Sequence, residues 1–245
     1  MAYTTKKEAK ESLYLNGEEK FGPLSSKAYA LFAPFALRNM YKYAIDDIVK
    51  AKAKNILEVG AGPGYLSIEL ARRLPSSKIY CIDPSEGMKK VGQNNIAKSG
   101  LKNVEYLLGS SRHVPLNSKF DVIFSTLSFH HWKKKSESIA YLLKFLAKKG
   151  ELLVYEYNKD GLGMILGLLV GNHSLSEEEI RRLAVEKKFK IWIKKRGRRI
   201  SRQILSLEEH ACCCPVDTLH FLIQPLLCCF GQLSSSLLMD LCSIS

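Results

Sequence analysis

The chain has 245 residues, of which 46% are hydrophobic and 25% charged, and its formal net charge is +13. This length and composition are typical of one sizeable globular domain with appendages. No apolar run reaches 18 residues, and residues 1–22 lack the apolar core of a signal peptide, so we expect a cytoplasmic protein without a membrane span. The basic charge allows nucleic acid as a partner, but the lysines are spread along the chain, which favours a solvated surface.

Charge and cysteine are divided unevenly along the chain. All 37 lysines and arginines, but only 20 of the 24 acidic residues, precede Leu207, so residues 1–206 carry +17 and residues 207–245 carry −4. Six of the seven cysteines also lie in this second part: Cys212, Cys213, Cys214, Cys228, Cys229 and Cys242. This change predicts a boundary between a domain at 21–206 and a poorly specified tail at 207–245.

The segment before the first predicted strand has two parts. Residues 1–20 are polar and predict a loose leader. Residues 21–50 are rich in aromatic and small side chains, and we expect short helices followed by a helix over Arg38–Ile48. The aromatic side chains suit core packing, or a helical lid over a ligand pocket, because this segment leads directly into the sheet.

A strand, a glycine-rich turn and a helix are predicted at residues 55–74. The apolar run Asn55–Val59 leads into Gly60, Gly62 and Gly64, and a helical pattern extends from Pro63 to Leu74. Proline suits a first helical turn, and glycines let a ligand approach the backbone. Strand, glycine turn and helix form the ligand-binding corner of an open α/β sheet, although a tight turn without a ligand has the same pattern.

The later elements alternate between strand and helix. The predicted strands are 78–82, 104–108, 120–125, 151–155, 189–193 and 200–205. The predicted helices are 86–99, 135–147 and one opened by Ser176 and Glu179 that runs to Lys188. The glycine-rich stretch 158–173 interrupts the alternation and is a second candidate lid. This pattern predicts an α/β fold with a doubly wound, mostly parallel, seven-stranded sheet.

Asp83 ends the second predicted strand, 23 residues after Gly60. This matches the spacing of about 20 residues at which an acidic side chain accepts hydrogen bonds from ribose hydroxyls in related sheets. A carboxylate here could also cap the helix that follows.

Four segments in order extend the pattern beyond one turn. They read ILEVGAGPG at 56–64, IYCIDPSEGM at 79–88, FDVIFSTLSFHHW at 120–132 and KGELLVYE at 149–156. The glycine spacing differs from the dinucleotide fingerprint, because Tyr65 stands where that pattern has its last small residue. Together the segments resemble the class I methyltransferases that depend on S-adenosylmethionine (SAM), in the small-molecule group similar to methyltransferase type 11. The resemblance covers 55–157, which we therefore expect to be the cofactor-binding core.

The resemblance implies a function and a set of site residues. The expected activity is transfer of the methyl group of SAM to an oxygen, nitrogen or carbon of a small-molecule acceptor by in-line displacement. The implied cofactor-binding residues are Glu58, Gly60, Ala61, Gly62, Gly64, Asp83, Pro84, Met88, Ser110, Ser111, Ser125 and Leu127. Among them, Glu58 and the glycines would hold the methionine part of SAM and Asp83 the ribose. Met88 would cover the adenine, or simply pack in its helix, and Ser125 and Leu127 would lie near the methyl group.

Two positions limit what the resemblance implies. Many relatives carry an acidic residue after the third strand that accepts from the adenine amino group, but this chain has Ser110 and Ser111 there, which accept without charge. His130 and His131 are the candidate catalytic bases, with a packing role as the alternative. Adjacent histidines rarely ligate one metal, and we predict no metal site.

The remaining alternatives concern the tail and the partner. The tail could bind zinc, touch or be anchored to a membrane, or extend the domain. Its contiguous cysteines disfavour zinc, and an extension of the domain is the leading interpretation. The alternative function is RNA binding or RNA methylation on the same scaffold, supported by the basic cluster at 194–199. The acceptor, the acceptor atom and the oligomeric state do not follow from the sequence.

Overall fold

The structure is a computed structural model of the whole chain, and it describes Leu13 and residues 37–158, 174–175, 178, 181–182, 190–196 and 200–206. All of these residues lie in the compact unit formed by residues 1–210. The predicted leader apart from Leu13, residues 21–36 of the predicted lid, the stretch 159–173 and the tail at 207–245 lie outside the described residues. The domain boundaries therefore stay predictions.

The described chain alternates between strands and helices as the sequence predicts. The strands are β1 (Asn55–Val59), β2 (Lys78–Asp83), β3 (Val104–Leu108), β4 (Phe120–Thr126), β5 (Leu146–Asn158), β6 (Ser174–Leu175), β7 (Lys190–Arg196) and β8 (Ile200–Ser206). The helices are α3 (Arg38–Lys50), α4 (Tyr65–Arg73), α5 (Glu86–Ser99), α6 (Lys135–Leu143) and the short 3₁₀ helix η1 (Phe129–His131).

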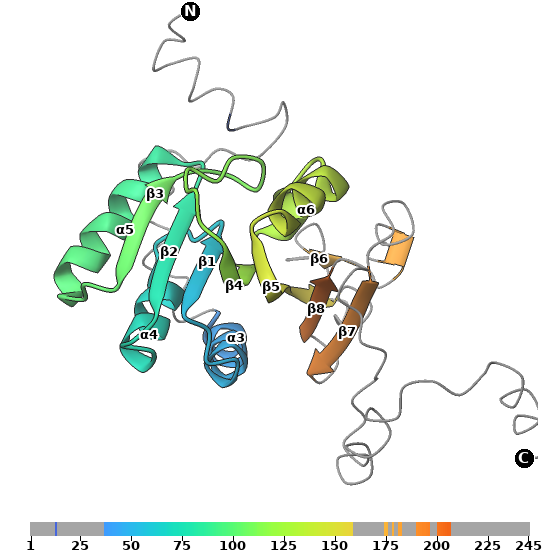
Figure 1. Cartoon of the computed structure of the whole chain (residues 1–245), viewed down its shortest axis with the longest axis horizontal. Helices are drawn as coiled ribbons and strands as arrows, with labels where there is room; N and C mark the ends of the chain where they lie inside the picture. Colours follow the sequence, from blue (N-terminus) through green and yellow to red (C-terminus); the bar gives the residue numbers. More distant parts are fainter. Residues whose placement is uncertain are drawn as a thin grey trace, which may run out of the picture. The chain divides into compact units, whose positions relative to one another are not determined.

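The strands form one sheet with the order β3-β2-β1-β4-β5-β8-β7 (Figure 1). Strands β1 to β5 pair in parallel, whereas β8 pairs antiparallel with both β5 and β7. The seven predicted strands correspond to β1–β5, β7 and β8, and the two-residue strand β6 adds an eighth beside β5. The strand order reverses between β1 and β4, and ligands of such sheets bind at the carboxyl ends of the strands at this point.

Helices cover both faces of the parallel strands. Helices α3 and α4 pack on one face in a cluster that includes Met40, Ile48 and Leu70, all fully buried. Helix α6 and η1 pack on the other face, where Ile139 and Leu142 are fully buried. The two apolar faces of β1, β2 and β4 explain why these strands read as nearly continuous hydrophobic runs.

Several predicted boundaries are wrong near β5. Helix α6 ends at Leu143, not at Ala147, and residues 146–150 belong to β5. Strand β5 is therefore much longer than the predicted 151–155, and Gly150 is inside it. A register shift between Phe120 and Val122 marks a bulge here, and a Cβ on Gly150 would lie 2.6 Å from the Phe120 carbonyl oxygen. The predicted start of the first helix at Pro63 is also wrong, because α4 begins at Tyr65 after the N-cap Gly64.

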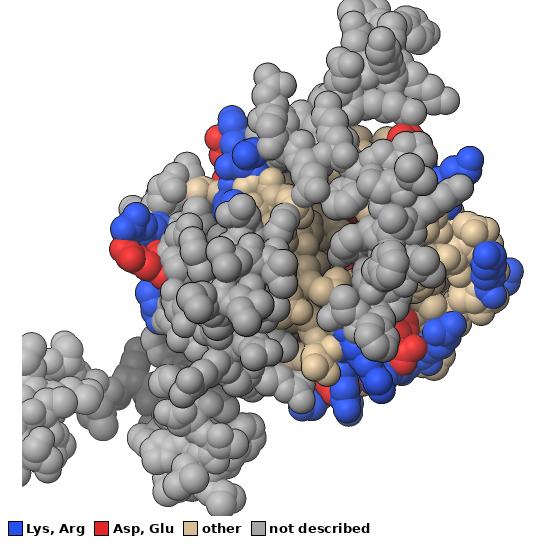
Figure 2. All heavy atoms as spheres, turned by 180° about the vertical axis from the view of Figure 1, so that it is seen from behind, with Lys and Arg blue, Asp and Glu red and all other residues tan. Residues whose placement is uncertain are grey.

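Lysines gather at the amino ends of the parallel strands. Lys54, Lys78, Lys102 and Lys119 precede or open β1 to β4, and all four are exposed. Because parallel strands start at the same edge of a sheet, these side chains share the edge opposite to the carboxyl ends. Figure 2 shows lysine and arginine groups gathered along the lower margin of the described surface, with fewer acidic groups between them.

Candidate functional site

The glycine turn between β1 and α4 has a backbone that requires glycine. Gly60, Gly62 and Gly64 have φ angles of 77°, 52° and 76°, in the left-handed region that other residues rarely adopt. The amide groups of Gly60 and Ala61 donate to the Ile82 carbonyl at 2.8 and 3.1 Å, which fixes the turn against the end of β2. Tyr106 in β3 donates from its hydroxyl to the Gly62 carbonyl.

Asp83 lies directly against this turn. Its Oδ2 accepts from the Gly62 amide at 3.0 Å, and its Oδ1 accepts from the Ser85 amide at 2.8 Å. Burial raises the pKa of Asp83 to about 6, although the amides of Ser85 and Gly62 act in the opposite direction. The structure therefore brings the predicted ribose-binding carboxylate and the glycine turn together. The helix that follows is capped by Ser85 and not by Asp83, because the Ser85 side chain accepts from the Met88 amide.

Glu58 is buried beneath the turn, in β1. Ser67 of α4 donates from its hydroxyl to Glu58 Oε2, so this carboxyl joins the strand to the helix that follows the turn. Burial is the main cause that raises the pKa of Glu58 to about 8. Glu58 thus links β1 to α4, and its role in holding the turn and its contact with the amino end of the cofactor stay predictions.

We expect Glu58 to make stability depend on pH. The pKa of Glu58 is higher in the folded chain than its ordinary value of 4.5, so its contribution to stability is complete below about pH 4.5 and is lost as the pH rises through about 8. The unfolding free energy should fall by on the order of a few kcal/mol between pH 5 and 9. Urea unfolding of the wild type and of Glu58→Gln across this range measures the effect. The neutral glutamine should show a much flatter profile, and identical profiles would contradict the assignment.

The loop after β4 closes the other side of the turn. A Cβ on Gly60 would lie 2.0 Å from Ser128 Oγ, so the two loops are in close contact. Leu127 has a φ of 52°, an uncommon conformation for a side chain of this size, which places strain next to the turn. Ser125 is fully buried, and its hydroxyl has no hydrogen-bond partner in the described part of the structure. An unpaired buried hydroxyl at the end of β4 is suited to a ligand that supplies the missing partner.

The other predicted residues lie around the same edge with different contacts. Met88 is buried in the first turn of α5, and Pro84 precedes that helix. Ser110 and His113 exchange backbone hydrogen bonds of 2.9 and 3.0 Å, and the Ser111 hydroxyl pairs with that of Ser138 at 2.9 Å. Both serines thus have partners within the protein, so their contact with adenine stays a prediction.

His130 has a partner that we did not predict. Its Nδ1 lies 2.9 Å from Oε2 of Glu156 in β5, and its backbone amide donates to Glu156 Oε1 at 3.3 Å. The ring of His131 lies against that of His130, with centroids 4.0 Å apart and ring planes tilted by 49°. Glu156 ends an apolar run in β5, as Asp83 does in β2, and this shared position is the signal that could have identified it.

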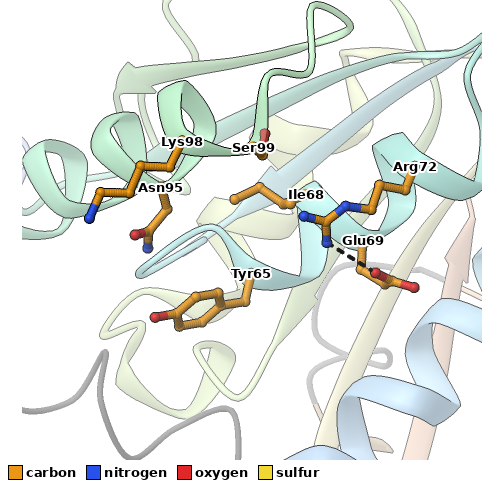
Figure 3. A pocket seen from close by; sticks show the side chains of 7 residues that line it. All are labelled: Tyr65, Ile68, Glu69, Arg72, Asn95, Lys98 and Ser99. Atoms are coloured by element: carbon orange, nitrogen blue, oxygen red, sulfur yellow. Dashed lines mark hydrogen bonds and ion pairs between the residues drawn. The ribbon is translucent and has the colours of Figure 1, made fainter.

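A groove of about 340 Å³ lies between α4 and α5 (Figure 3). It is lined by Tyr65, Ile68, Glu69, Arg72, Asn95, Lys98 and Ser99. Glu69 and Arg72 form an ion pair across one turn of α4 at 3.4 Å. None of the predicted cofactor residues lines this groove, so it belongs to the helical layer and not to the predicted site.

Comparison with known proteins agrees with this geometry. A family model described as a methyltransferase domain matches residues 56–150, which include the glycine turn, Asp83 and His130. The chain thus contains a methyltransferase domain at residues 56–150. The Asp83 carboxylate presents acceptor oxygens and the glycine turn presents backbone groups, which are the features that the predicted cofactor site requires.

Curated relatives match only part of this chain. It is 27% identical over 118 residues to an uncharacterized methyltransferase of Staphylococcus carnosus, covering 47% of this chain and 53% of the relative. It is 33% identical over 96 residues to a malonyl-[acyl-carrier protein] O-methyltransferase of Geobacter sulfurreducens, covering 39% and 35%. A ubiquinone/menaquinone biosynthesis C-methyltransferase of Idiomarina loihiensis is 25% identical over 129 residues, covering 51% of each chain. The chain thus spans about half or less of these relatives.

Solved structures show that the methyltransferase fold extends further. A SAM-dependent methyltransferase from Aquifex aeolicus has a TM-score of 0.62 at 22% identity, covering 76% of this chain and 98% of that one. An O-methyltransferase of neocarzinostatin biosynthesis, solved with S-adenosyl-L-homocysteine and 1,4-dihydroxy-2-naphthoic acid, has a TM-score of 0.64 at 16% identity, covering 75% and 58%. At these identities the likeness shows the fold alone.

No described helix has the length and apolar character needed to cross a bilayer. No three His, Cys, Asp or Glu residues of the described part form a group that could hold a metal ion. The cysteines of the tail lie outside this part, so the zinc alternative stays untested.

Proposed function

We propose that this chain transfers the methyl group of SAM to an oxygen, nitrogen or carbon nucleophile of a small-molecule acceptor. The observation that carries the proposal is the hydrogen bond between the Asp83 carboxylate and the Gly62 amide. It joins the two features that the resemblance implies for opposite ends of one cofactor molecule. The family match to residues 56–150 supports the same reading.

The protein's part in this reaction is mainly to hold and orient the reactants. SAM supplies a methyl group already activated on a sulfonium. The glycine turn would receive the methionine part, Asp83 would accept from the ribose hydroxyls, and Met88 would cover the adenine. Ser125 and Leu127 would then lie near the methyl group, at the carboxyl end of β4. Correct positioning of two reactants can supply several kcal/mol of the barrier, and no charged catalytic group is needed to activate the methyl.

This proposal does not specify which atom of the acceptor receives the methyl group. The names of the relatives cover O-methylation of a malonyl carrier protein and C-methylation in quinone biosynthesis, and a structural neighbour was solved with a dihydroxynaphthoic acid. These proteins share the methyltransferase fold but act on different groups. Most of these names support an organic acceptor of low molecular mass, but no relative's own acceptor is assigned to this chain.

Calorimetric titration with SAM at different pH values tests the proposal. Asp83 has a pKa of about 6 in the folded chain, so its carboxylate is mostly ionised at pH 7 and mostly protonated at pH 5. Ribose hydroxyls donate best to the ionised form, and we expect affinity to fall about tenfold from pH 7 to pH 5. Asp83→Asn should bind weakly, without this dependence. A folded wild-type protein that gives no heat at millimolar SAM would contradict the proposal.

A nucleic acid is the second candidate partner, and the lysine-lined amino edge of the sheet favours it. Lys54, Lys78, Lys102 and Lys119 are exposed and lie along one edge. Such a row could neutralise backbone phosphates, and its affinity would decrease steeply with salt. This edge is opposite to the candidate cofactor site, so phosphate contacts there would anchor a large partner and would not contact the methyl group.

A further inference from the structure

Tyr106 of β3 is a buried side chain that reaches the glycine turn. Only 4% of this residue is exposed, and its ring packs in the apolar cluster on the face of the sheet that α3 and α4 cover. Its hydroxyl donates to the Gly62 carbonyl, while the Gly62 amide donates to Asp83 Oδ2 at 3.0 Å. Gly62 is therefore held by both of its backbone polar groups, one from β3 and one from the end of β2.

Two glycines make room for the Tyr106 ring. A Cβ on Gly92 of α5 would lie 2.2 Å from Cε2 and 2.5 Å from Cδ2 of the ring, and a Cβ on Gly64 would lie 3.5 Å from Cε2. Gly92 lies in the interior of α5, where alanine ordinarily favours a helix more than glycine does. Because the ring fills the space between α5 and the turn, the hydroxyl has little freedom to leave the Gly62 carbonyl.

Helix α5 also holds the turn directly. Asn95 donates from its side-chain amide to the Pro63 carbonyl at 2.9 Å, and Gln93 donates to the Tyr106 carbonyl at 3.2 Å. The carbonyls of Gly62 and Pro63 follow one another in the turn, and each accepts from a side chain of β3 or α5. These contacts direct two consecutive carbonyl groups of the turn toward β3 and α5.

The N–H groups of the turn are also bound within the protein. Gly60 and Ala61 donate to the same carbonyl at the end of β2, and Gly64 donates to the Ala61 carbonyl at 2.9 Å. Gly62 donates to Asp83, and the proline of the turn has no N–H group. A ligand therefore meets a surface whose shape these contacts set. A change in the orientation of Gly62 would alter both the turn and the carboxylate that is bound to it.

Resting on the proposed function, we propose that Tyr106 is a positioning residue of the cofactor site. Its hydroxyl fixes the orientation of Gly62, and through the Gly62 amide it aligns the Asp83 carboxylate with the ribose hydroxyls of SAM. Tyr106 needs no contact with SAM in this arrangement, because it acts through the two residues that we expect to bind the cofactor. Phenylalanine would fill the same space but would leave the Gly62 carbonyl without this donor.

The ionisation of Asp83 in the protein without cofactor tests the link between Tyr106 and the carboxylate. The Gly62 amide lowers the pKa of Asp83, so loss of this hydrogen bond should raise the pKa above its wild-type value of about 6. Carbon-13 spectra of the full chain with labelled aspartate measure this pKa, and Asp83→Asn identifies the signal. We expect a higher Asp83 pKa in Tyr106→Phe than in the wild type. An unchanged Asp83 pKa in a folded Tyr106→Phe protein would overturn the proposal.

Tyr80→Phe is the matched control for this measurement. Tyr80 is a buried tyrosine of the neighbouring strand β2, but it packs on the opposite face of the sheet, and its ring lies 4.8 Å from Lys78 Nζ at the amino edge. Loss of its hydroxyl should leave the Asp83 pKa unchanged. Glu58 is the neighbouring carboxyl, and its pKa of about 8 keeps its titration apart from that of Asp83.

Calorimetric titration with SAM at pH 7 tests the consequence for the cofactor. Loss of one neutral hydrogen bond behind the site should lower the SAM affinity of Tyr106→Phe about fivefold, whereas Tyr80→Phe should stay within about twofold of the wild type. Equal affinities of Tyr106→Phe and the wild type would overturn the positioning role. A wild-type protein that does not bind SAM counts against the proposed function itself, and the Asp83 pKa in Tyr106→Phe still decides whether the tyrosine sets the carboxylate.

Gly92 provides a second test, which acts on the ring and not on the hydroxyl. Gly92→Ala should displace the Tyr106 ring and lower the SAM affinity by about tenfold or more, even though alanine suits the helix. Adding Tyr106→Leu removes the clashing ring atoms, so it should recover stability in urea without recovering the SAM affinity. Recovery of both would show that Tyr106 acts only through packing and would overturn the proposal.

Discussion

Replacement of Asp83 by alanine is expected to weaken SAM binding by about a hundredfold or more, because two ribose hydroxyls would lose a charged acceptor worth about 1.5–3 kcal/mol each. The same change leaves the amides of Gly62 and Ser85 without their acceptor, so the turn itself would also lose order. Calorimetric titration at pH 7 measures the affinity, and unfolding in urea shows whether the variant is folded.

Asp121 provides a matched control for this substitution. Its Oδ2 accepts from the backbone amides of Lys54 and Asn55 at 2.8 and 3.0 Å, so it also holds a chain segment through two amides. It lies at the start of β4, at the amino edge of the sheet, where no cofactor contact is expected. Asp121→Ala should therefore lower stability but leave the SAM affinity within about twofold. Equal losses of affinity in the two variants would show that Asp83 acts only through the fold.

Replacement of Gly60 by alanine is expected to destabilise the protein by several kcal/mol and to abolish SAM binding. The left-handed backbone costs a non-glycine residue about 1–2 kcal/mol. A Cβ would in addition lie 2.0 Å from Oγ and 2.6 Å from Cβ of Ser128, so the turn and the loop after β4 would have to separate. Overpacking of this kind adds about 1–3 kcal/mol. Urea unfolding and SAM titration of the variant measure the two effects.

Gly100 allows the strain and the clash to be separated. It has a φ of 70°, close to the 77° of Gly60, but a Cβ there would meet no atom within 4 Å. Gly100→Ala should therefore cost only the backbone strain and should leave SAM binding unchanged. Ser128→Gly, added to Gly60→Ala, removes the clashing atoms and should recover part of the stability. Equal destabilisation by Gly60→Ala and Gly100→Ala would contradict the close packing of the two loops.

The parts of the fold that follow from the sequence are those with a strong local signal. Strands β1 and β3 and helix α5 begin and end at the residues that the sequence pattern predicts, although the N-cap of α5 is Ser85 and not Asp83. Asp83 was identified from its position at the end of an apolar strand, and the structure places it against the glycine turn. In these cases the local preference and the tertiary structure agree.

The errors arise where distant contacts decide the structure. Residues 144–149 read KFLAKK, a good helical sequence, yet β5 begins at Leu146 because Phe120 of β4 pairs with it. The partner of His130 was missed for the same reason, since Glu156 lies 26 residues further along the chain. Ser128 gave no signal at all, because its importance comes from the glycine that faces it. A sequence predicts which side chains end strands, but the register of neighbouring strands decides which of them meet.

A crystal structure of the protein with S-adenosylhomocysteine tests the central claim most directly, because it locates both ends of the ligand at once. We predict the ribose hydroxyls within hydrogen-bond distance of the Asp83 carboxylate, with the homocysteine part along the turn at Gly60–Gly64. A ligand bound elsewhere, for example in the groove between α4 and α5, or one that contacts the turn but not Asp83, would contradict the proposal that Asp83 and the glycine turn bind one cofactor molecule.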